Sequence, residues 1–346
     1  MSENNTASDD LLLLKGSDID HLLRRQEAAI LTAVQRAYQI HAKGLTVMPP
    51  DGYLHFPGRE KERIISKVAY LGGDFDVAGI KWIASFPGNL AKGMERASAT
   101  LILNSIETGR PFAIMESAII SAKRTGASAA LGARELWPHD RLTSVGLIGC
   151  GLINFETLRF LLAVYPMSDT VHLYDVSADR AAQFCAKAQP LKDGLRCVLE
   201  EDFPAVIARA PVVSLATTAV VPHLTSLARH QEQAVMLHVS LRDFTAELIL
   251  QADNVVDDVD KVCSNNTSVH LAEQHVGHRD FIRTTIGDLL NDDTPSRDFS
   301  KPFSIYSPFG LGILDLAVAD LAYRLAQAQH VGTTIEGFLS KSWLER

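Results

Sequence analysis

The chain contains 346 residues, of which 33 are Lys or Arg and 41 are Asp or Glu, so its formal net charge is −8. At roughly 150 residues per domain, this length predicts two domains and is ample for a hydrophobic core. Hydrophobic residues make up 47% and charged residues 21%, a composition typical of a globular protein and not of a disordered chain. The acidic balance argues against a nucleic-acid or anionic-membrane partner, because both need a concentrated basic face.

The ends and the cysteines indicate a reduced, cytoplasmic protein. The chain has no run of about 18 apolar residues, so a transmembrane helix is not expected. Met1–Asp10 is polar and acidic, which predicts a frayed tail and not a secretory signal. The four cysteines form no C-x-x-C pair and have no companion histidine at zinc spacing. We therefore expect neither a disulfide scaffold nor a metal site.

The first part of the chain is predicted to be a helix followed by an antiparallel, meander-like sheet. Residues 11–14 are predicted to form a short apolar strand, and helical spacing of apolar residues runs from Asp18 to Ala42. Short apolar runs between turn residues predict further strands. These runs are 53–56, 64–71, 77–83, 99–103 and 111–115. A long helix is expected from Ser117 to Leu136, and its small residues at 125–130 would let another backbone approach closely.

From Ser144 the pattern changes to the strand and helix alternation of a doubly wound sheet. The expected strands are 144–148, 171–174, 212–216, 235–239 and 254–256, and the expected helices are 154–164 and 178–188. The polar segment 291–301 is predicted to be a loop, and 313–329 an apolar helix. The predicted fold class is therefore α/β with two domains. Residues 138–312 are expected to form a Rossmann domain, and residues 1–137 and 313–346, on either side of it in the sequence, a discontinuous α+β domain.

The sharpest motif is Gly149-Cys150-Gly151-Leu152-Ile153-Asn154, which follows a strand and opens a helix. Gly149 would allow the tight turn, and Gly151 would let the backbone reach a pyrophosphate at the helix N-terminus. Asn154 replaces the third glycine of the fingerprint, so the match is imperfect. The alternative is an ordinary strand-to-helix turn.

Asp175 strengthens the dinucleotide interpretation. It ends the second strand about twenty residues past the motif, where an acidic residue would bind ribose hydroxyls and disfavour a 2′-phosphate. We therefore predict NAD and not NADP as the cofactor. The alternative for Asp175 is a helix cap or a turn residue. We also expect Thr217, Ser240 and Gly310 to contribute to the cofactor site.

Charged side chains in apolar surroundings are candidates for the chemical site. Lys67, Lys81 and Arg96 lie in or beside apolar strands, where burial is costly unless the charge is paired. Each could instead occupy the solvent side of a half-exposed strand, and Arg124 could be an exposed helical arginine. Asp243 follows a strand at the carboxyl edge of the doubly wound sheet, where ligands bind, although turns also favour aspartate.

Several long motifs, in chain order, resemble the ornithine cyclodeaminase/mu-crystallin family over nearly the whole chain after the first ten residues. The motifs are 79–83, 94–98, 103–109, Ser121-Ala122-Lys123-Arg124-Thr125-Gly126-Ala127-Ser128 and the nucleotide turn. Within that family, 148–153 and Gly332-Thr333-Thr334 are most similar to the 2,3-diaminopropionate-forming dehydrogenases of the staphyloferrin B type.

The resemblance implies a role for each candidate. The first domain would bind substrate and form a homodimer, Lys81 would lie beside the nicotinamide, Arg124 would hold the substrate carboxylate, and Asp243 would act in acid–base chemistry. In the subgroup, a Y-L-R stretch supplies another carboxylate-binding arginine. This chain has Tyr53-Leu54-His55 there, which leaves His55 in that position and Lys67 as a substitute cation.

The implied reaction is NAD-dependent oxidative cleavage of N-(2-amino-2-carboxyethyl)-L-glutamate to 2,3-diaminopropionate and 2-oxoglutarate, for siderophore or non-ribosomal peptide synthesis. Three carboxylates on that substrate suit a pocket with Lys67, Lys81, Arg96 and Arg124. The alternatives are an ornithine cyclodeaminase or imine reductase, which differ in whether NADH accumulates, and a non-enzymatic binder of cofactor and ligand. Retention of Lys81, Arg124 and Asp243 together favours an enzyme.

Overall fold

A computed structural model describes residues 9–341 and 343–345, so most of the predicted N-terminal tail lies outside the described residues. The chain divides into two compact units. The first comprises Met1–Arg124 and Leu311–Arg346, and the second comprises Thr125–Gly310. The division therefore falls inside α3 (Ala118–Leu136) and just before α11 (Gly312–Gln329), whereas the sequence placed it at 137/138 and 312/313.

The first unit is built on a mixed sheet in the order β16-β1-β7-β6-β5-β4-β2, with β3 also pairing with β4. Its strands are β1 (Leu11–Leu14), β2 (Thr46–Val47), β3 (Gly52–Phe56), β4 (Arg59–Leu71), β5 (Val77–Ser85), β6 (Ala97–Ser105), β7 (Pro111–Glu116) and β16 (Thr333–Ile335). Antiparallel pairing from β4 to β7 confirms the predicted meander. Two pairings extend it, because β1 lies parallel to β7 and antiparallel to β16.

The predicted single helix over 18–42 is wrong. Two helices occupy this region, α1 (Gly16–Leu22) and α2 (Glu27–Ala42). Arg25, between them, has a φ of 57°. A left-handed residue cannot continue a right-handed helix, so the chain turns even though the apolar spacing persists on both sides.

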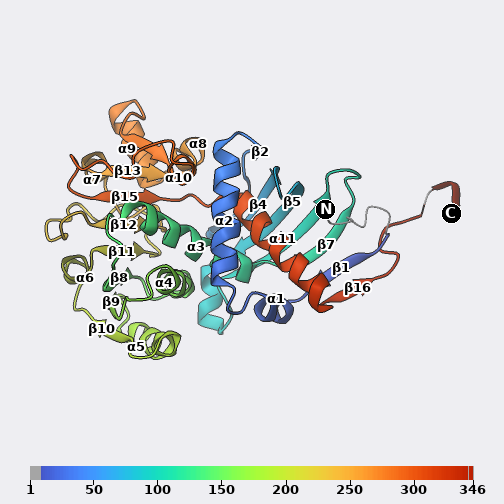
Figure 1. Ribbon diagram of the computed structural model, residues 1–346, viewed down its shortest axis with the longest axis horizontal. Helices are drawn as coiled ribbons and strands as arrows, with labels where there is room; N and C mark the ends of the chain where they lie inside the picture. Colours follow the sequence, from blue (N-terminus) through green and yellow to red (C-terminus); the bar gives the residue numbers. More distant parts are fainter. Residues whose placement is uncertain (1–8, 342, 346) are drawn as a thin grey trace. The chain divides into compact units, whose positions relative to one another are not determined.

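Helices α2 and α11 pack together in the first unit, and α11 also packs on β4, β5 and β6 (Figure 1). The first half of α11 is buried on all sides, which explains its almost continuous apolar sequence. The close approach needs a glycine on the sheet, since a Cβ on Gly79 would lie 2.9 Å from the Leu316 side chain. The fold thus brings a helix from the end of the chain onto β5.

The second unit confirms the doubly wound prediction. Its strands are all parallel and have the order β10-β9-β8-β11-β12-β15-β13-β14. The chain adds β9 and β10 on one side of β8 and then places β11 on its other side, so the order of strand addition reverses between β8 and β11. The strands are β8 (Ser144–Ile148), β9 (Thr170–Tyr174), β10 (Arg196–Leu199), β11 (Val212–Leu215), β12 (Val235–His238), β13 (Asp253–Val256), β14 (Ile282–Thr285) and β15 (Ser304–Ser307). Figure 1 shows α4 (Leu152–Val164) on one side of this sheet and α6 (Phe203–Arg209) on the other.

Short elements complete the second unit, and most were missed from sequence. Besides α5 (Ala178–Ala188), which was predicted, the helices are α7 (Ala246–Gln251), α8 (Val259–Val262), α9 (Ser268–Val276) and α10 (Ile286–Leu290). The small-residue segment of α3 does allow a close approach. A Cβ on Gly126 would lie 2.7 Å from the Glu156 carbonyl carbon, which is backbone of α4.

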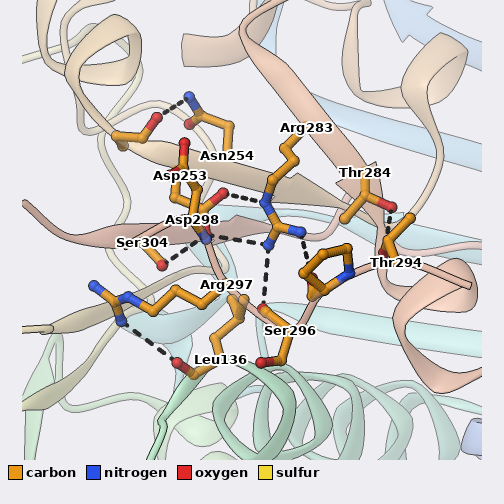
Figure 2. A network of polar contacts seen from close by, with 12 residues as sticks. Leu136, Asp253, Asn254, Arg283, Thr284, Thr294, Ser296, Arg297, Asp298 and Ser304 are labelled. Atoms are coloured by element: carbon orange, nitrogen blue, oxygen red, sulfur yellow. Dashed lines mark hydrogen bonds and ion pairs between the residues drawn. The ribbon is translucent and has the colours of Figure 1, made fainter. Parts of the chain in front are cut away.

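The predicted loop 291–301 is held by a buried polar network, drawn in Figure 2. Arg283 of β14 donates to both oxygens of Asp253, at 2.5 and 3.1 Å, and to the carbonyls of Pro295 and Ser296. The Ser304 hydroxyl donates to the same Asp253 carboxylate at 3.0 Å. Asp253 and Ser304 begin β13 and β15, so this network lies at the amino edge of the sheet and fixes the loop there. Ligands bind at the opposite, carboxyl edge.

Candidate functional site

The glycine-rich turn lies at the point where the strand order of the second sheet reverses. Gly149 has a φ of 92°, and a Cβ there would lie 2.6 Å from the Ala216 carbonyl oxygen. Both facts require glycine. Gly151 is the extended N-cap of α4, and a Cβ on it would meet open space. The second glycine is therefore not demanded by packing, which leaves access for a ligand at the helix N-terminus, where Leu152 and Ile153 form the first turn.

Asn154, which replaces the third glycine, has its side chain turned into the protein. It is fully buried and donates to the carbonyls of Ile148 and Gly149 at 3.0 and 2.7 Å. Its amide oxygen accepts a hydrogen bond from the Ser214 hydroxyl at 2.7 Å. Asn154 thus ties the end of β8 to β11 and shapes the turn through these bonds.

Asp175 lies beside the same turn. One carboxylate oxygen accepts the backbone N–H of Cys150 at 2.7 Å, and the other accepts that of Ser177 at 2.9 Å. Asp175 therefore holds the glycine turn and the turn that leads into α5, whose N-cap is Ser177 and not Asp175. The next residue, Val176, is 93% exposed, so the end of β9 is open to solvent.

A second polar cluster surrounds Asp243, just after β12. The carboxylate is fully buried and accepts hydrogen bonds from the hydroxyls of Thr217, at 2.5 Å, and Ser240. Leu241, two residues earlier, has a φ of 67°, a strained conformation for a branched side chain. Strain of this kind persists where the surroundings hold the backbone in place, and it sets Asp243 at the carboxyl edge of the sheet.

His238 completes this cluster and was missed from sequence. It is fully buried, and its Nε2 accepts the backbone N–H of Asp243 at 3.2 Å. Burial lowers the pKa of His238 below its usual range. The imidazole is therefore neutral, and its 3.3 Å approach to the Asp243 carboxylate is not an ion pair. The only available signal was a histidine at the end of an apolar strand.

The surroundings of Asp243 favour its ionised form. Burial raises the pKa of this carboxyl, but the hydroxyls of Ser240 and Thr217 donate hydrogen bonds to it and oppose burial, and the pKa lies below its ordinary value. Asp243 can therefore accept a proton at neutral pH.

Gly310 lies on a loop at the same edge, after β15. Its backbone N–H donates to Asp257 at 2.7 Å, and that of Phe309 donates to the same carboxylate at 2.8 Å. Gly310 has a φ of 89°, which requires glycine. The loop is thus pinned to the end of β13.

The first unit carries its own buried charge cluster, centred on Asp315 of α11. Lys81 Nζ donates to one oxygen of Asp315 at 2.6 Å, and Arg124 Nε donates to the other at 3.1 Å. Both cations also donate to the Ser121 hydroxyl, at 3.2 and 3.3 Å. Lys81 is 1% and Arg124 8% exposed, so the solvent-side alternatives for these two residues are wrong. Among the described residues, Arg124 Nη1 has no hydrogen-bond partner, which leaves an edge of the guanidinium for a ligand.

Charges in this cluster shift the protonation equilibria of Lys81 and Asp315. Burial lowers the pKa of Lys81 to about 7, with Asp315 opposing the shift and Arg124 adding to it. Burial raises the pKa of Asp315, but Arg124 and Lys81 reverse this, so the carboxyl stays ionised. Sequence reasoning missed Asp315, although an acid inside an apolar helix was a visible signal.

The remaining candidates lie on neighbouring strands of the first sheet. Lys67, directly opposite Lys81 in the β4–β5 pairing, donates to Asp51 at 2.6 Å. Its charge is therefore already compensated, which weakens it as a substitute cation. Arg96 is half-buried and donates to the Ser85 hydroxyl at 3.3 Å. His55 is exposed and stacks on Tyr53, with ring centroids 6.1 Å apart.

Neither a metal-binding cluster nor a membrane-spanning helix is present within residues 9–341 and 343–345. No group of three or more His, Cys, Asp or Glu side chains is placed to hold a metal ion there. Across the same residues, no helix is long and apolar enough to span a membrane.

Comparisons with known proteins agree with this architecture. A model of the ornithine cyclodeaminase/mu-crystallin family matches residues 11–330. The N-((2S)-2-amino-2-carboxyethyl)-L-glutamate dehydrogenase of Staphylococcus aureus is 29% identical over 332 residues, covering 94% of this chain and 98% of the relative. An alanine dehydrogenase of Archaeoglobus fulgidus is 31% identical over 340 residues, covering 95% of this chain and 99% of that protein.

Solved structures have the same fold. An archaeal alanine dehydrogenase dimer with bound NAD superposes with a TM-score of 0.84 at 27% identity, covering 94% of this chain and 99% of that one. The Thermococcus litoralis Delta(1)-pyrroline-2-carboxylate reductase, with NADH and L-proline, gives 0.86 at 23% identity, covering 93% and 99%, and bears on the fold alone. The predicted fold class and family resemblance are both confirmed: the chain belongs to the ornithine cyclodeaminase/mu-crystallin family.

Proposed function

We propose that this protein is an NAD-dependent oxidoreductase that cleaves N-(2-amino-2-carboxyethyl)-L-glutamate oxidatively, giving 2,3-diaminopropionate and 2-oxoglutarate. The observation that carries the proposal is the buried Lys81–Asp315–Arg124 cluster, which presents cationic groups in a family whose relatives are amino-acid oxidoreductases. The product would serve siderophore or non-ribosomal peptide assembly.

NAD is supported by the glycine turn and by the archaeal neighbour solved with NAD. Gly149 and Gly151 meet the requirements of a dinucleotide turn, and the Asp175 carboxylate beside them disfavours a 2′-phosphate. Thr217, Ser240 and Gly310 lie at the same carboxyl edge of the sheet, after β11, β12 and β15. When bound, the nicotinamide would accept hydride from the substrate.

The chain's own residues would bind the substrate and move the protons. Arg124 would clamp a carboxylate with the free edge of its guanidinium, beside Lys81. As hydride leaves the glutamate α-carbon, the secondary amine loses its N–H proton to Asp243 and becomes an imine. Water then adds to the imine carbon and the carbon–nitrogen bond breaks, releasing the amine product and the oxo acid.

A second candidate on the same scaffold is a cyclic imine reductase, because Delta(1)-pyrroline-2-carboxylate reductases of Bacillus are among the relatives, at 22% identity for the Bacillus cereus protein. An ornithine cyclodeaminase is the third. A cyclodeaminase regenerates its cofactor in each turnover, and an imine reductase consumes NADH. Of these three reactions, only the proposed one accumulates NADH from NAD⁺.

A homodimer is also proposed, on an uncovered face of the first sheet. Leu54, Val68 and Trp82 are 44%, 47% and 45% exposed. Their strand positions point away from the face that carries Lys67 and Lys81, because side chains alternate along a strand. An apolar sheet face of this kind fits a second copy of the chain, and the archaeal neighbour is described as a dimer.

A cytoplasmic location is proposed because the cysteine thiols are unpaired. All four cysteines are free in the structure. Burial raises the pKa of the Cys150 and Cys263 thiols to about 12, so they stay protonated. Unpaired thiols suit a reducing compartment.

The direct test of function supplies the purified protein with NAD⁺ and N-(2-amino-2-carboxyethyl)-L-glutamate. We expect NADH absorbance to rise in step with 2,3-diaminopropionate and 2-oxoglutarate, both identified by mass spectrometry. Ornithine and Delta(1)-pyrroline-2-carboxylate with NADH serve as the competing substrates. Faster turnover of either one would replace the proposal with the corresponding alternative.

Substitutions at Arg124 and Asp243 are expected to change different kinetic constants. Arg124→Lys keeps the charge but loses the planar fork, so KM should rise about ten- to a hundredfold with a smaller loss of kcat. Asp243→Asn keeps the shape and removes the base, so kcat should fall about 10²- to 10⁴-fold while NAD binding persists. Steady-state kinetics and cofactor titration by fluorescence measure both. Near-normal kcat in Asp243→Asn would reduce this residue to a turn aspartate.

A substitution at Gly151 distinguishes the space needed for the cofactor from the space needed for packing of the protein itself. In Gly151→Ala the new methyl group meets open space in the protein, so the melting temperature should stay within about 2 °C of wild type. The same methyl would block the approach of a pyrophosphate, and we expect NAD affinity to fall at least tenfold. Gly88→Ala, at another open glycine, is the control and should keep both properties. Unchanged NAD affinity in Gly151→Ala would place the cofactor elsewhere.

The dimer is tested by light scattering at micromolar concentration. Wild type should have about twice the 37.8 kDa chain mass, and Trp82→Glu should yield monomer because it places a charge on the proposed interface. Leu90→Glu, at a comparably exposed leucine outside the sheet, should remain dimeric. A wild-type protein that scatters as a single chain contradicts this interface.

A further inference from the structure

A second pair of cations lies on the first sheet, apart from the Asp315 cluster. Arg63 of β4 stands directly opposite Ser85 of β5, and Arg96 donates to the hydroxyl of the same serine at 3.3 Å. The backbone fixes this arrangement, because Phe86 N–H donates to the Arg96 carbonyl at 2.9 Å. Arg63 and Arg96 therefore converge on one point, at the ends of β4, β5 and β6.

This pair has no acidic partner among the described residues. Two other half-buried cations of the chain are each paired with an acid, Lys67 with Asp51 and Arg283 with Asp253. Burial lowers the pKa of Arg96, and the nearby Arg63 charge lowers it further, so the two guanidinium groups repel each other. Such a pair costs stability unless an anion joins it. It is also unexpected in a chain whose net charge is −8.

Both cation clusters lie on the same face of the sheet. Side chains at 63, 65 and 67 of β4 share one face, and their partners on β5 are Ser85, Ile83 and Lys81. Four residues of strand separate Arg63 from Lys67, about 13 Å at 3.3 Å per residue. Ile65 and Ile83, paired between them, form an apolar floor. Along this face, a cationic end at Arg63 is followed by an apolar surface at Ile65 and Ile83 and then by a second cationic end at Lys81.

We infer that Arg63 and Arg96 form a second anion site, which binds a distal carboxylate of an amino acid that carries several carboxylates. The inference rests on the proposed function and gives it a specificity determinant. Arg124 and Lys81 would bind the first carboxylate, the carbon chain would lie over Ile65 and Ile83, and the second site would bind the far end. A substrate with one carboxylate, such as alanine, would leave Arg63 and Arg96 unsatisfied and would bind weakly.

Calorimetric titration with tricarballylate, a tricarboxylate without an amine, tests the site without turnover. In the presence of NADH, wild type should bind tricarballylate, and Arg63→Gln and Arg96→Gln should each weaken binding about ten- to a hundredfold. Arg141→Gln removes the same charge from an exposed position in the second unit, and it should bind like wild type. Circular dichroism melts confirm that each variant is folded. A wild type that does not bind, or an Arg63→Gln variant with unchanged affinity, overturns the inference.

Turnover separates this inference from the proposed function. With N-(2-amino-2-carboxyethyl)-L-glutamate and NAD⁺, Arg63→Gln should raise KM about ten- to a hundredfold with little change in kcat. If wild type binds tricarballylate through Arg63 but forms no NADH, the proposed reaction is wrong and the anion site stands. If wild type forms NADH and Arg63→Gln does so with the same KM, the reaction stands and the anion site is wrong.

Discussion

A single buried carboxylate, Asp315, organises the charged centre of the first unit. It binds Lys81 and Arg124, which lie 234 and 191 residues away in sequence. Each of these cations would be costly to bury alone, and losing the shared acid would leave both uncompensated. The rest of the unit is arranged to make this contact: α11 is apolar around Asp315, and Gly79 lets the helix approach β5.

The second unit contains a buried acid with a different environment. The Asp243 carboxylate meets two hydroxyls and a neutral imidazole, whereas Asp315 is held by two cations. A carboxylate fixed between cations orients its partners and gives up its charge only at low pH. A carboxylate held by hydroxyls remains available to accept a proton. Two buried acids thus suit two roles, one in positioning and one in proton transfer.

Local patterns predicted much of the fold. The strand 144–148, the glycine turn and α4 were found because strand, turn and helix follow one another within twenty-five residues. The break at Arg25 was missed because apolar spacing continues across it. Helix α8 has only four residues, too few for a helical period to show, and β14 is equally short and has one apolar side chain, Ile282.

The candidate site was predicted only where a motif marks it. Lys81, Arg124 and Asp243 were identified, and each is buried in a polar cluster. Asp315, His238 and Arg63 were missed, because their roles depend on neighbours distant in sequence or across a strand pair. Lys67 was predicted to be a substitute cation, because its pairing with Asp51 has no local signature in the sequence.

The pH dependence of kcat/KM tests whether Asp315 sets the charge state of Lys81. The pKa of Lys81 is about 7, so loss of its proton should lower kcat/KM as pH rises through that value. In Asp315→Asn the opposing charge is gone, the pKa of Lys81 falls further, and this limb should move to lower pH. Asp320→Asn, at an acid of the same helix paired with Arg324, should leave it in place. A limb that stays near pH 7 in a folded Asp315→Asn variant would contradict the account.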